Sequence, residues 1–169
     1  TDFELMGAAL DEARKAAALG EVPVGAVVAR NGQIGRAHNT RETEKNALHH
    51  AELLAIDAAC KALAAGGCGE CELFVTLEPC PMCAGAIPEQ PASGGWCTAR
   101  PMPRRVLRQG VTDLLALPFN HHPWLEQGLR GPRKPEHCCR RFFKDLRVRL
   151  AARPKWKRPA PPAENMKKP

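Results

Sequence analysis

Apolar residues recur every three or four positions in several stretches of the chain, which is the spacing of an amphipathic helix. The first such stretch predicts a helix that Thr1 or Asp2 caps and Gly20 ends. The helices expected after it cover residues 50–64, 81–86 and 140–152.

Shorter apolar runs between these helices predict β-strands. Residues 24–29 and 33–38 flank Asn31-Gly32, the residue pair typical of a tight hairpin. A further strand is predicted over 72–77, directly before the third helix. The second helix therefore lies between a hairpin and a strand.

Residues 88–110 follow neither periodicity, and they carry four prolines and the pair Gly94-Gly95. A structureless stretch of this length is unusual inside a compact domain. Ordered structure is predicted again over 111–117. From residue 153 onward, five prolines among Lys and Arg predict a disordered basic tail. We therefore expect one domain over 1–152 and a tail over 153–169.

Composition places the chain among soluble globular proteins. It has 169 residues, 44% of them hydrophobic and 25% charged, which suits a single domain. No apolar run reaches the roughly 18 residues of a membrane span, and the first residues lack a secretory pattern, so we expect a cytoplasmic protein. In that compartment the eight cysteines favour metal ligation over disulfides.

The formal net charge of +7 is unevenly distributed, with −6 over residues 1–99 and +13 over residues 100–169. This asymmetry favours contact between the C-terminal part and a polyanion such as nucleic acid. A basic tail that only increases solubility explains the same asymmetry, so charge alone leaves both interpretations open.

Two short motifs carry the candidate chemistry, His50-Ala51-Glu52 and Pro79-Cys80-Pro81-Met82-Cys83. Cys80 and Cys83 are three residues apart at a predicted helix start, so both sulfurs share one face, and the positive helix end favours thiolates. With His50 they offer three ligands of the kind that zinc prefers. Three protein ligands leave a fourth tetrahedral position for water, as in catalytic zinc sites. The motifs therefore predict a catalytic zinc ion.

Glu52 is the expected proton carrier of this site. Two thiolates cancel the charge of Zn²⁺, so such a site acidifies its water less than a three-histidine site does. A carboxylate beside the water then has to take its proton and deliver it elsewhere. Glu52 follows His50 by two residues. We expect it to act as the general base and not as a ligand.

Cys68-Gly69-Glu70-Cys71 offers a rival metal site. Together with Cys80 and Cys83 it would form a structural four-cysteine zinc knuckle. That interpretation leaves His50 and Glu52 without a role. It also requires both ends of an apolar strand to meet at one ion, although an extended chain of this length spans well over about 20 Å.

The two motifs resemble the signature of the zinc-dependent cytidine deaminase superfamily. The resemblance is closer to one branch, the bacterial tRNA adenosine deaminases. It covers residues 1–87 and 111–152. The runs that carry it are Glu21-Val22-Pro23-Val24-Gly25-Ala26-Val27, Arg36-Ala37-His38-Asn39, His49-His50-Ala51-Glu52, Val75-Thr76-Leu77-Glu78-Pro79-Cys80-Pro81-Met82-Cys83-Ala84-Gly85-Ala86, Leu117-Pro118-Phe119-Asn120-His121 and Arg141-Phe142-Phe143.

The resemblance implies an α/β fold, a three-layer sandwich in which helices flank a mixed β-sheet, and a homodimer. It implies hydrolytic deamination of adenosine to inosine at the wobble position of a tRNA anticodon, with zinc-activated water and Glu52 as proton carrier. His50, Cys80 and Cys83 match the zinc ligands. Asn39 and the backbone of Ala51 match positions that contact the flipped nucleoside, although Asn39 also suits a plain turn position.

The last predicted helix lies where the family places contacts with RNA. Arg141, Lys144 and Arg147 follow one another at intervals of three residues, which predicts a basic stripe. Their replacement by Glu is expected to weaken tRNA binding and to flatten its salt dependence.

After Ile87 the chain departs from the family pattern, which has an Arg-Val-Val-Tyr-Gly-like run there. One hypothesis is a reading-frame slip. Residues 94–105, back-translated with permitted codons and read two bases later, give Arg-Val-Val-Tyr-Gly-Ala-Pro-Asp-Ala-Lys. The segments 64–69 and 133–139 fall under the same hypothesis.

Two other functions remain open at this stage. One is a deaminase of a free nucleobase or nucleoside with the same zinc signature. The other is an inactive zinc- or RNA-binding relic.

Overall fold

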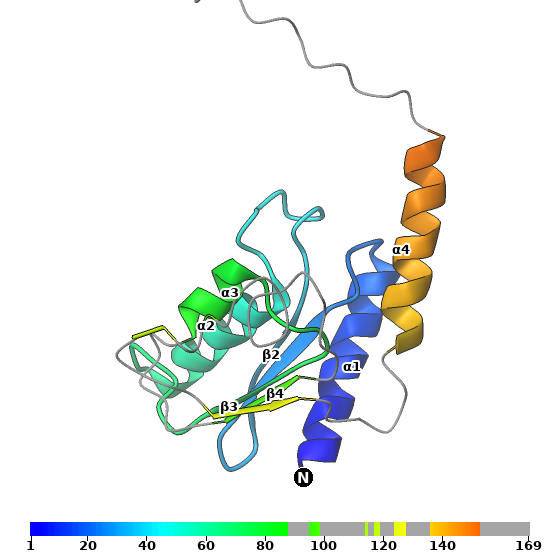
Figure 1. Cartoon of the computed structure of the whole chain (residues 1–169). Helices are drawn as coiled ribbons and strands as arrows, with labels where there is room; N and C mark the ends of the chain where they lie inside the picture. The colour runs from blue at the N-terminus through cyan, green and yellow to red at the C-terminus, as the bar shows by residue number, and fades with distance from the viewer. Residues whose placement is uncertain (88–94, 99–113, 115–116, 119–123, 128–135, 153–169) are drawn as a thin grey trace, which may run out of the picture.

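The computed structural model describes residues 1–87, 95–98, 114, 117–118, 124–127 and 136–152. Helices cover both faces of one β-sheet (Figure 1). The helices are α1 (Asp2–Ala18), α2 (Ala51–Leu63), α3 (Pro81–Ala86) and α4 (Glu136–Ala151). The strands are β1 (Gly25–Ala29), β2 (Gln33–His38), β3 (Glu72–Val75), β4 (Gly95–Thr98) and β5 (Trp124–Gln127).

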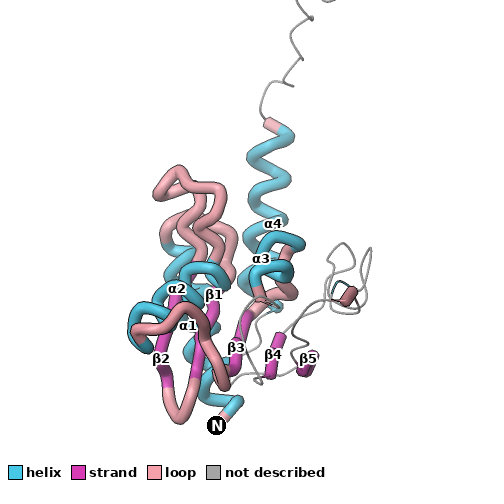
Figure 2. Tube along the Cα trace, turned by 90° about the vertical axis from the view of Figure 1, so that its left-hand side faces the viewer, coloured by secondary structure: helices cyan, strands magenta, loops and turns pink. Residues whose placement is uncertain are grey.

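The strands lie in the order β2-β1-β3-β4-β5, which Figure 2 shows side by side. Antiparallel pairing joins β1 to β2 and to β3, whereas β3, β4 and β5 run parallel. The sheet is therefore mixed. Together with the helices on its two faces, this confirms the predicted α/β sandwich.

Side chains of β1 point alternately to the two faces of the sheet, as the pleat of a strand requires. Ala26 and Val28 belong to a core cluster with α2, and Val27 and Ala29 belong to a second cluster with α1. The largest fully buried side chain is Phe74 of β3, on the α1 side. Both faces are thus buried, and this accounts for the uninterrupted apolar run of β1.

Two glycines let the helices lie unusually close to the sheet. A Cβ atom at Gly25 would lie 2.1 Å from the backbone oxygen of Ala9 in α1. A Cβ atom at Gly35 would lie 2.5 Å from the backbone oxygen of Ala55 in α2. Neither distance is possible for a real Cβ atom, so only glycine fits at these two positions.

The first 87 residues fold as the sequence predicts, with small shifts at element ends. Thr1 caps α1 in a capping box with Glu4, and Asn31 and Gly32 adopt positive φ in the hairpin turn. The second helix covers 51–63, not 50–64, and the strand expected over 72–77 ends at Val75. The start of α2 and the end of β3 both lead toward the candidate site.

The later part of the chain differs more from the prediction. The sequence predicts no element over 88–110, yet β4 lies within that stretch and pairs with β3. The strand β5 was also not predicted, and α4 begins at Glu136, not at Arg140. Both missed strands have four residues and lack the uninterrupted apolar run by which β3, a strand of the same length, was predicted.

Some expectations lie outside the described residues. These are the tail 153–169 and most of the segment 111–117. The division into a domain over 1–152 and a tail therefore stays a prediction. Within the part of the chain that is described, no helix combines the length and the apolar character that a membrane crossing requires.

Candidate metal centre

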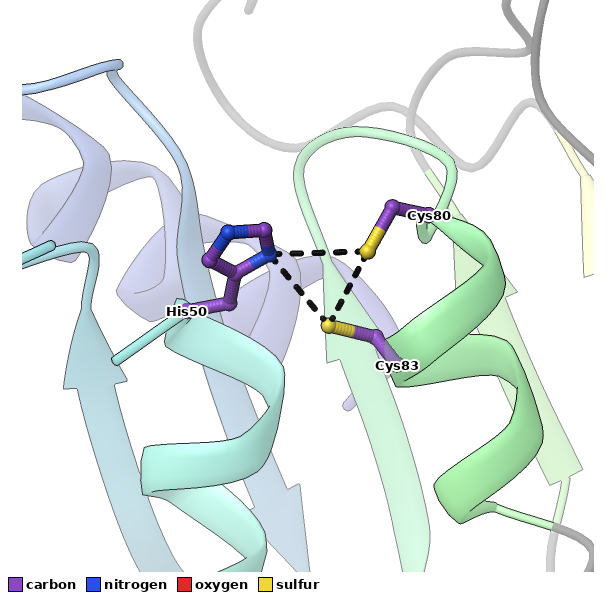
Figure 3. A group of neighbouring side chains, drawn as sticks. All are labelled: His50, Cys80 and Cys83. Carbon is purple, nitrogen blue, oxygen red and sulfur yellow. Dashed lines mark hydrogen bonds between the residues drawn. The ribbon is translucent and has the colours of Figure 1, made fainter. Parts of the chain in front are cut away.

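The three predicted ligands lie at the starts of two neighbouring helices. His50 precedes α2 as its N-cap, and Cys80 precedes α3 in the same way. Neither side chain caps its own helix, so both are directed elsewhere. Pro81 occupies the first helical position, where its missing N–H costs nothing, and Cys83 follows within the same turn. Figure 3 shows the three side chains converging.

The distances among these side chains suit a tetrahedral zinc ion. The Nδ1 atom of His50 lies 3.5 Å from each sulfur, and the two sulfurs of Cys80 and Cys83 lie 3.6 Å apart. A tetrahedral zinc ion has a Zn–S distance of about 2.3 Å and a Zn–N distance of about 2.0 Å. It therefore requires about 3.5 Å between the nitrogen and each sulfur and about 3.8 Å between the two sulfurs. The imidazole and the two thiols therefore fit this ion in geometry and in chemistry.

The two thiols have opposite pKa shifts. The hydrogen bond with Cys83 and, to a smaller extent, the ring of His50 together lower the pKa of Cys80 to about 3, against the opposing effect of burial. The hydrogen bond with Cys80 raises the pKa of Cys83, as do burial and the nearby Glu52. Without a cation the pair therefore keeps one proton, on Cys83. A metal ion displaces that proton, because thiolates are the ligands.

Glu52 lies in the first turn of α2 and is 4% exposed. It lines a cavity of about 320 Å³ that His50 also lines, so one of the three candidate ligands forms part of the cavity wall. This volume is at the lower end of the range for small-molecule sites. The lining residues are Val22, Val24, Asn39, Arg41, His50, Glu52, Leu77, Glu78 and Phe143.

Asn39 follows β2 directly, is 5% exposed and lines the cavity. Its backbone N–H donates to the carbonyl oxygen of Val24, and its side-chain amide donates to Glu21. Asn39 therefore lies at the cavity with its side chain held, and its contact with a nucleoside stays a prediction. Ala51 is fully buried in the core cluster between α2 and the sheet and is not among the residues that line the cavity, and the contact expected from its backbone stays a prediction.

Among the charged and aromatic cavity residues, three were not predicted as site residues. Arg41 and Glu78 are close in the chain to Asn39 and to Cys80, so proximity to those motifs could have indicated them. Phe143 comes from α4, which packs against α1, and the sequence indicated an apolar helix position there and a place in the Arg141-Phe142-Phe143 run of the resemblance, but no role at the site. The fold alone brings that ring to the cavity.

The expected basic stripe lies on the outer side of α4. Arg141, Lys144 and Arg147 are exposed, whereas Phe142 and Phe143 are half-buried. The only described partner of Arg141 is a distant ion pair with Asp145, at 4.0 Å. A role in RNA binding stays a prediction.

The rival four-cysteine site does not form. Within the described residues, the only His, Cys and acidic groups close enough to share an ion are His50, Cys80 and Cys83. The sulfur of Cys68 lies instead 3.4 Å from that of Cys60. The extended strand β3 separates this pair from the metal centre, as its length requires.

Comparisons with known proteins agree with this centre. A tRNA-specific adenosine deaminase of Bacillus subtilis (strain 168) is 58% identical over 83 residues, which are 48% of this chain and 52% of that protein. A tRNA(Ile)-lysidine synthase of Deinococcus deserti is 40% identical over 151 residues, 88% of this chain and 28% of that protein. The chain thus spans about half the length of the first relative and about a quarter of the second.

A solved structure from a study of A-to-I editing by tRNA:A34 deaminases has a TM-score of 0.68 and 34% identity, and the match covers 74% of this chain and 97% of that one. The model of the cytidine and deoxycytidylate deaminase zinc-binding region matches residues 1–93. The matched range contains every ligand of the metal centre and extends over more than half of the sequence. The chain therefore belongs to the cytidine and deoxycytidylate deaminase zinc-binding family.

Proposed function

We propose that the chain catalyses the hydrolytic deamination of adenosine to inosine at the wobble position of a tRNA anticodon. The observation that carries this proposal is one cavity whose wall contains the candidate zinc ligand His50, the carboxylate of Glu52 and the amide of Asn39. The similarity to tRNA deaminases in sequence and in fold supports the choice of substrate.

The reaction consumes water and adenosine and releases ammonia and inosine. Zinc, when bound, supplies the Lewis acidity that activates the water. Glu52 takes one proton from the water and passes it to N1 of the base while the water oxygen bonds to C6. Glu52 then carries the second proton of that oxygen to the amino group, so that the bond between C6 and the amino nitrogen breaks and ammonia leaves. The burial of Glu52 excludes other water from this transfer. Asn39 orients the nucleoside, and the apolar side chains of Val22 and Leu77 exclude solvent from the base.

The size of the cavity suits one nucleobase and not a folded stretch of RNA. A base of an anticodon loop therefore has to leave its stack to enter, as in other deaminases that act on nucleic acids. Phe143 offers an aromatic face for stacking at the cavity wall. Arg141, Lys144 and Arg147 continue outward along the same helix, where they would contact phosphates.

The stripe can be tested separately from the chemistry. Arg141→Glu, Lys144→Glu and Arg147→Glu together are expected to weaken binding of the anticodon stem-loop at least about tenfold in moderate salt. The slope of log Kd against log salt concentration, measured by fluorescence anisotropy, should become flatter by two to three, because two to three fewer counterions are released on binding. Unchanged binding would reduce the stripe to a solvated surface.

This proposal includes two finer points that follow from a tRNA substrate and from the family resemblance. The protein is expected in the cytoplasm, and it is expected to form a homodimer. Light scattering on the purified chain measures the second point directly, as twice the chain mass.

The decisive assay uses an anticodon stem-loop with adenosine at position 34 and zinc-loaded full-length chain, with inosine detected by mass spectrometry after nuclease digestion. Inosine should form in the stem-loop, with no conversion of free adenosine or guanine. Conversion of the free compounds alone would assign a nucleobase or nucleoside deaminase. A zinc-loaded chain that converts none of them would be a binding module.

A further inference from the structure

A buried carboxylate outside the cavity wall contacts the cavity through Asn39. Glu21 is 1% exposed and directly follows Gly20, which ends α1 with a φ of 77°. The backbone N–H of Glu21 donates to the carbonyl oxygen of Ala16 at 2.9 Å, and that of Gly20 donates to Ala17 at 3.1 Å. These are the two hydrogen bonds of a Schellman ending. The end of α1 therefore fixes where Glu21 lies.

All the side-chain partners recorded for Glu21 are donors. Its Oε2 atom accepts from the side-chain amide of Asn39 at 3.0 Å. Its Oε1 atom accepts from the backbone N–H of Thr43 at 2.5 Å and from the Thr43 hydroxyl at 2.7 Å. A residue of the α1 ending is thus bonded to two points of the loop after β2.

This bonding determines which way the Asn39 amide faces. A carboxylate without a proton can only accept hydrogen bonds, so the amide nitrogen has to face Glu21. The carbonyl oxygen of Asn39 then lies on the side of the amide away from Glu21, and Asn39 itself lines the cavity. Rotation of the amide by half a turn would place two oxygens against each other and would lose the bond.

The second partner acts on the loop itself. The backbone N–H of Thr40 donates to the carbonyl oxygen of His49 at 3.1 Å and closes the neck of the loop 40–49. Thr43 is the point at which Glu21 holds the far part of that loop. Arg41, which lines the cavity, lies between the neck and this anchor.

We propose that Glu21 is a positioning residue: it selects the end of the Asn39 amide that faces the cavity, and it anchors the loop 40–49 over the cavity through Thr43. The inference rests on the proposed deaminase function for its consequence on substrate. Its structural part, the orientation of the Asn39 amide, stands independently of any activity.

The first variant, Glu21→Gln, keeps the shape of the side chain and replaces one acceptor oxygen by an NH₂ group. With the glutamine oxygen bonded to Thr43, its NH₂ group faces Asn39, and the Asn39 amide has to turn to accept from it. The cavity then meets NH₂ in place of the carbonyl oxygen. We expect KM for the stem-loop to rise on the order of tenfold or more, with a smaller change in kcat.

The second variant, Asn39→Asp, places two carboxylates against each other and should also lose at least about tenfold in kcat/KM. The double variant Glu21→Gln with Asn39→Asp reverses donor and acceptor across the same contact. It again presents an oxygen to the cavity, so kcat/KM should return to within several-fold of the unchanged protein. Rescue of this kind requires direct coupling of the two side chains.

Zinc content and melting temperature serve as controls, and both should match those of Glu70→Gln, which alters a surface ion pair with Arg30. Losses that multiply in the double variant would overturn the proposal. So would a Glu21→Gln protein with unchanged KM.

A readout without substrate separates this inference from the proposed function. In ¹⁵N-labelled protein, the side-chain amide signal of Asn39, assigned by its absence in Asn39→Ala, should shift in Glu21→Gln. An unchanged signal overturns the inference even if the protein makes inosine. If the signal shifts in Glu21→Gln and the unchanged protein makes no inosine, the proposed function is overturned and the positioning role stays in place.

Discussion

The chain contains two Cys-x-x-Cys motifs that meet very different surroundings. Cys80 and Cys83 begin a helix beside the imidazole of His50, and the pKa of Cys80 falls to about 3. Cys68 lies against Cys60, and burial, followed by the hydrogen bond with Cys60, raises its pKa to about 12. Burial also raises the pKa of Cys71. Identical spacing therefore gives a metal centre only where a third ligand and a helix start coincide.

The largest difference is expected in metal content. Cys83→Ser should reduce bound zinc from about one ion per chain to near zero and lower deamination by at least about a thousandfold, because two ligands do not hold the ion. The matched variant Cys68→Ser with Cys71→Ser should keep the zinc and cost about 1–3 kcal/mol of stability, since it places hydroxyls in buried positions. Elemental analysis and thermal unfolding measure the two effects.

Removal of the carboxylate should separate metal binding from chemistry. Glu52→Ala is expected to lower the rate of inosine formation by about 10²- to 10⁴-fold, the usual contribution of a general base. Zinc should stay at about one ion per chain, measured on the same sample. Loss of zinc in this variant would mean that Glu52 is a ligand and that its assigned role is wrong.

Alkylation of zinc-free protein should distinguish the thiols. At pH 7 a thiol with a pKa of about 3 is wholly ionised, whereas one with a pKa of about 12 is almost wholly protonated. The lower nucleophilicity of the more acidic thiolate offsets part of this advantage. Cys80 should still react with iodoacetamide at least about tenfold faster than Cys68, with little dependence between pH 5 and pH 8. Peptide mass spectrometry gives both rates, and equal rates would contradict the assigned surroundings.

The smallest effect is expected from exchanging the residues inside the motif. The double variant Pro81→Gly with Met82→Glu gives the metal centre the two inner residues of the other Cys-x-x-Cys motif, Gly69-Glu70. Loss of the proline at the helix start should weaken zinc binding about two- to fivefold, because the unligated turn gains freedom. Competition with a chromogenic chelator measures this. A loss as large as that of Cys83→Ser would show that the proline is essential to ligation.

The sequence predicted the metal centre well because the residues that determine it are close together in the chain. Pro81 and the preceding strand indicate the helix start at which Cys80 and Cys83 lie, and the Asn31-Gly32 pair indicates the hairpin. The strands β4 and β5 were missed because neither has an uninterrupted apolar run such as that of β3, and β4 lies in the Pro- and Gly-rich stretch 88–110.

The alignment with the Deinococcus deserti protein covers 151 residues and so extends through that stretch. The reading-frame hypothesis itself is tested by the DNA sequence that encodes this stretch.

The cavity wall could not be predicted in the same way. Phe143 reaches it only because α4 packs on α1, and Glu21 bonds to Asn39 because the end of α1 meets the loop after β2. Such contacts between distant segments depend on the finished fold. The spacing of Phe143 and Glu21 along the chain does not indicate these contacts.

The ring of Phe143 reaches the cavity from an element that carries none of the candidate metal ligands. Those ligands lie between residues 50 and 83, at the starts of α2 and α3, whereas Phe143 lies in α4. Substitutions in α4 can therefore reshape the cavity wall while the three ligands stay as they are. A new substrate preference can arise in this fold with no change in the reaction itself.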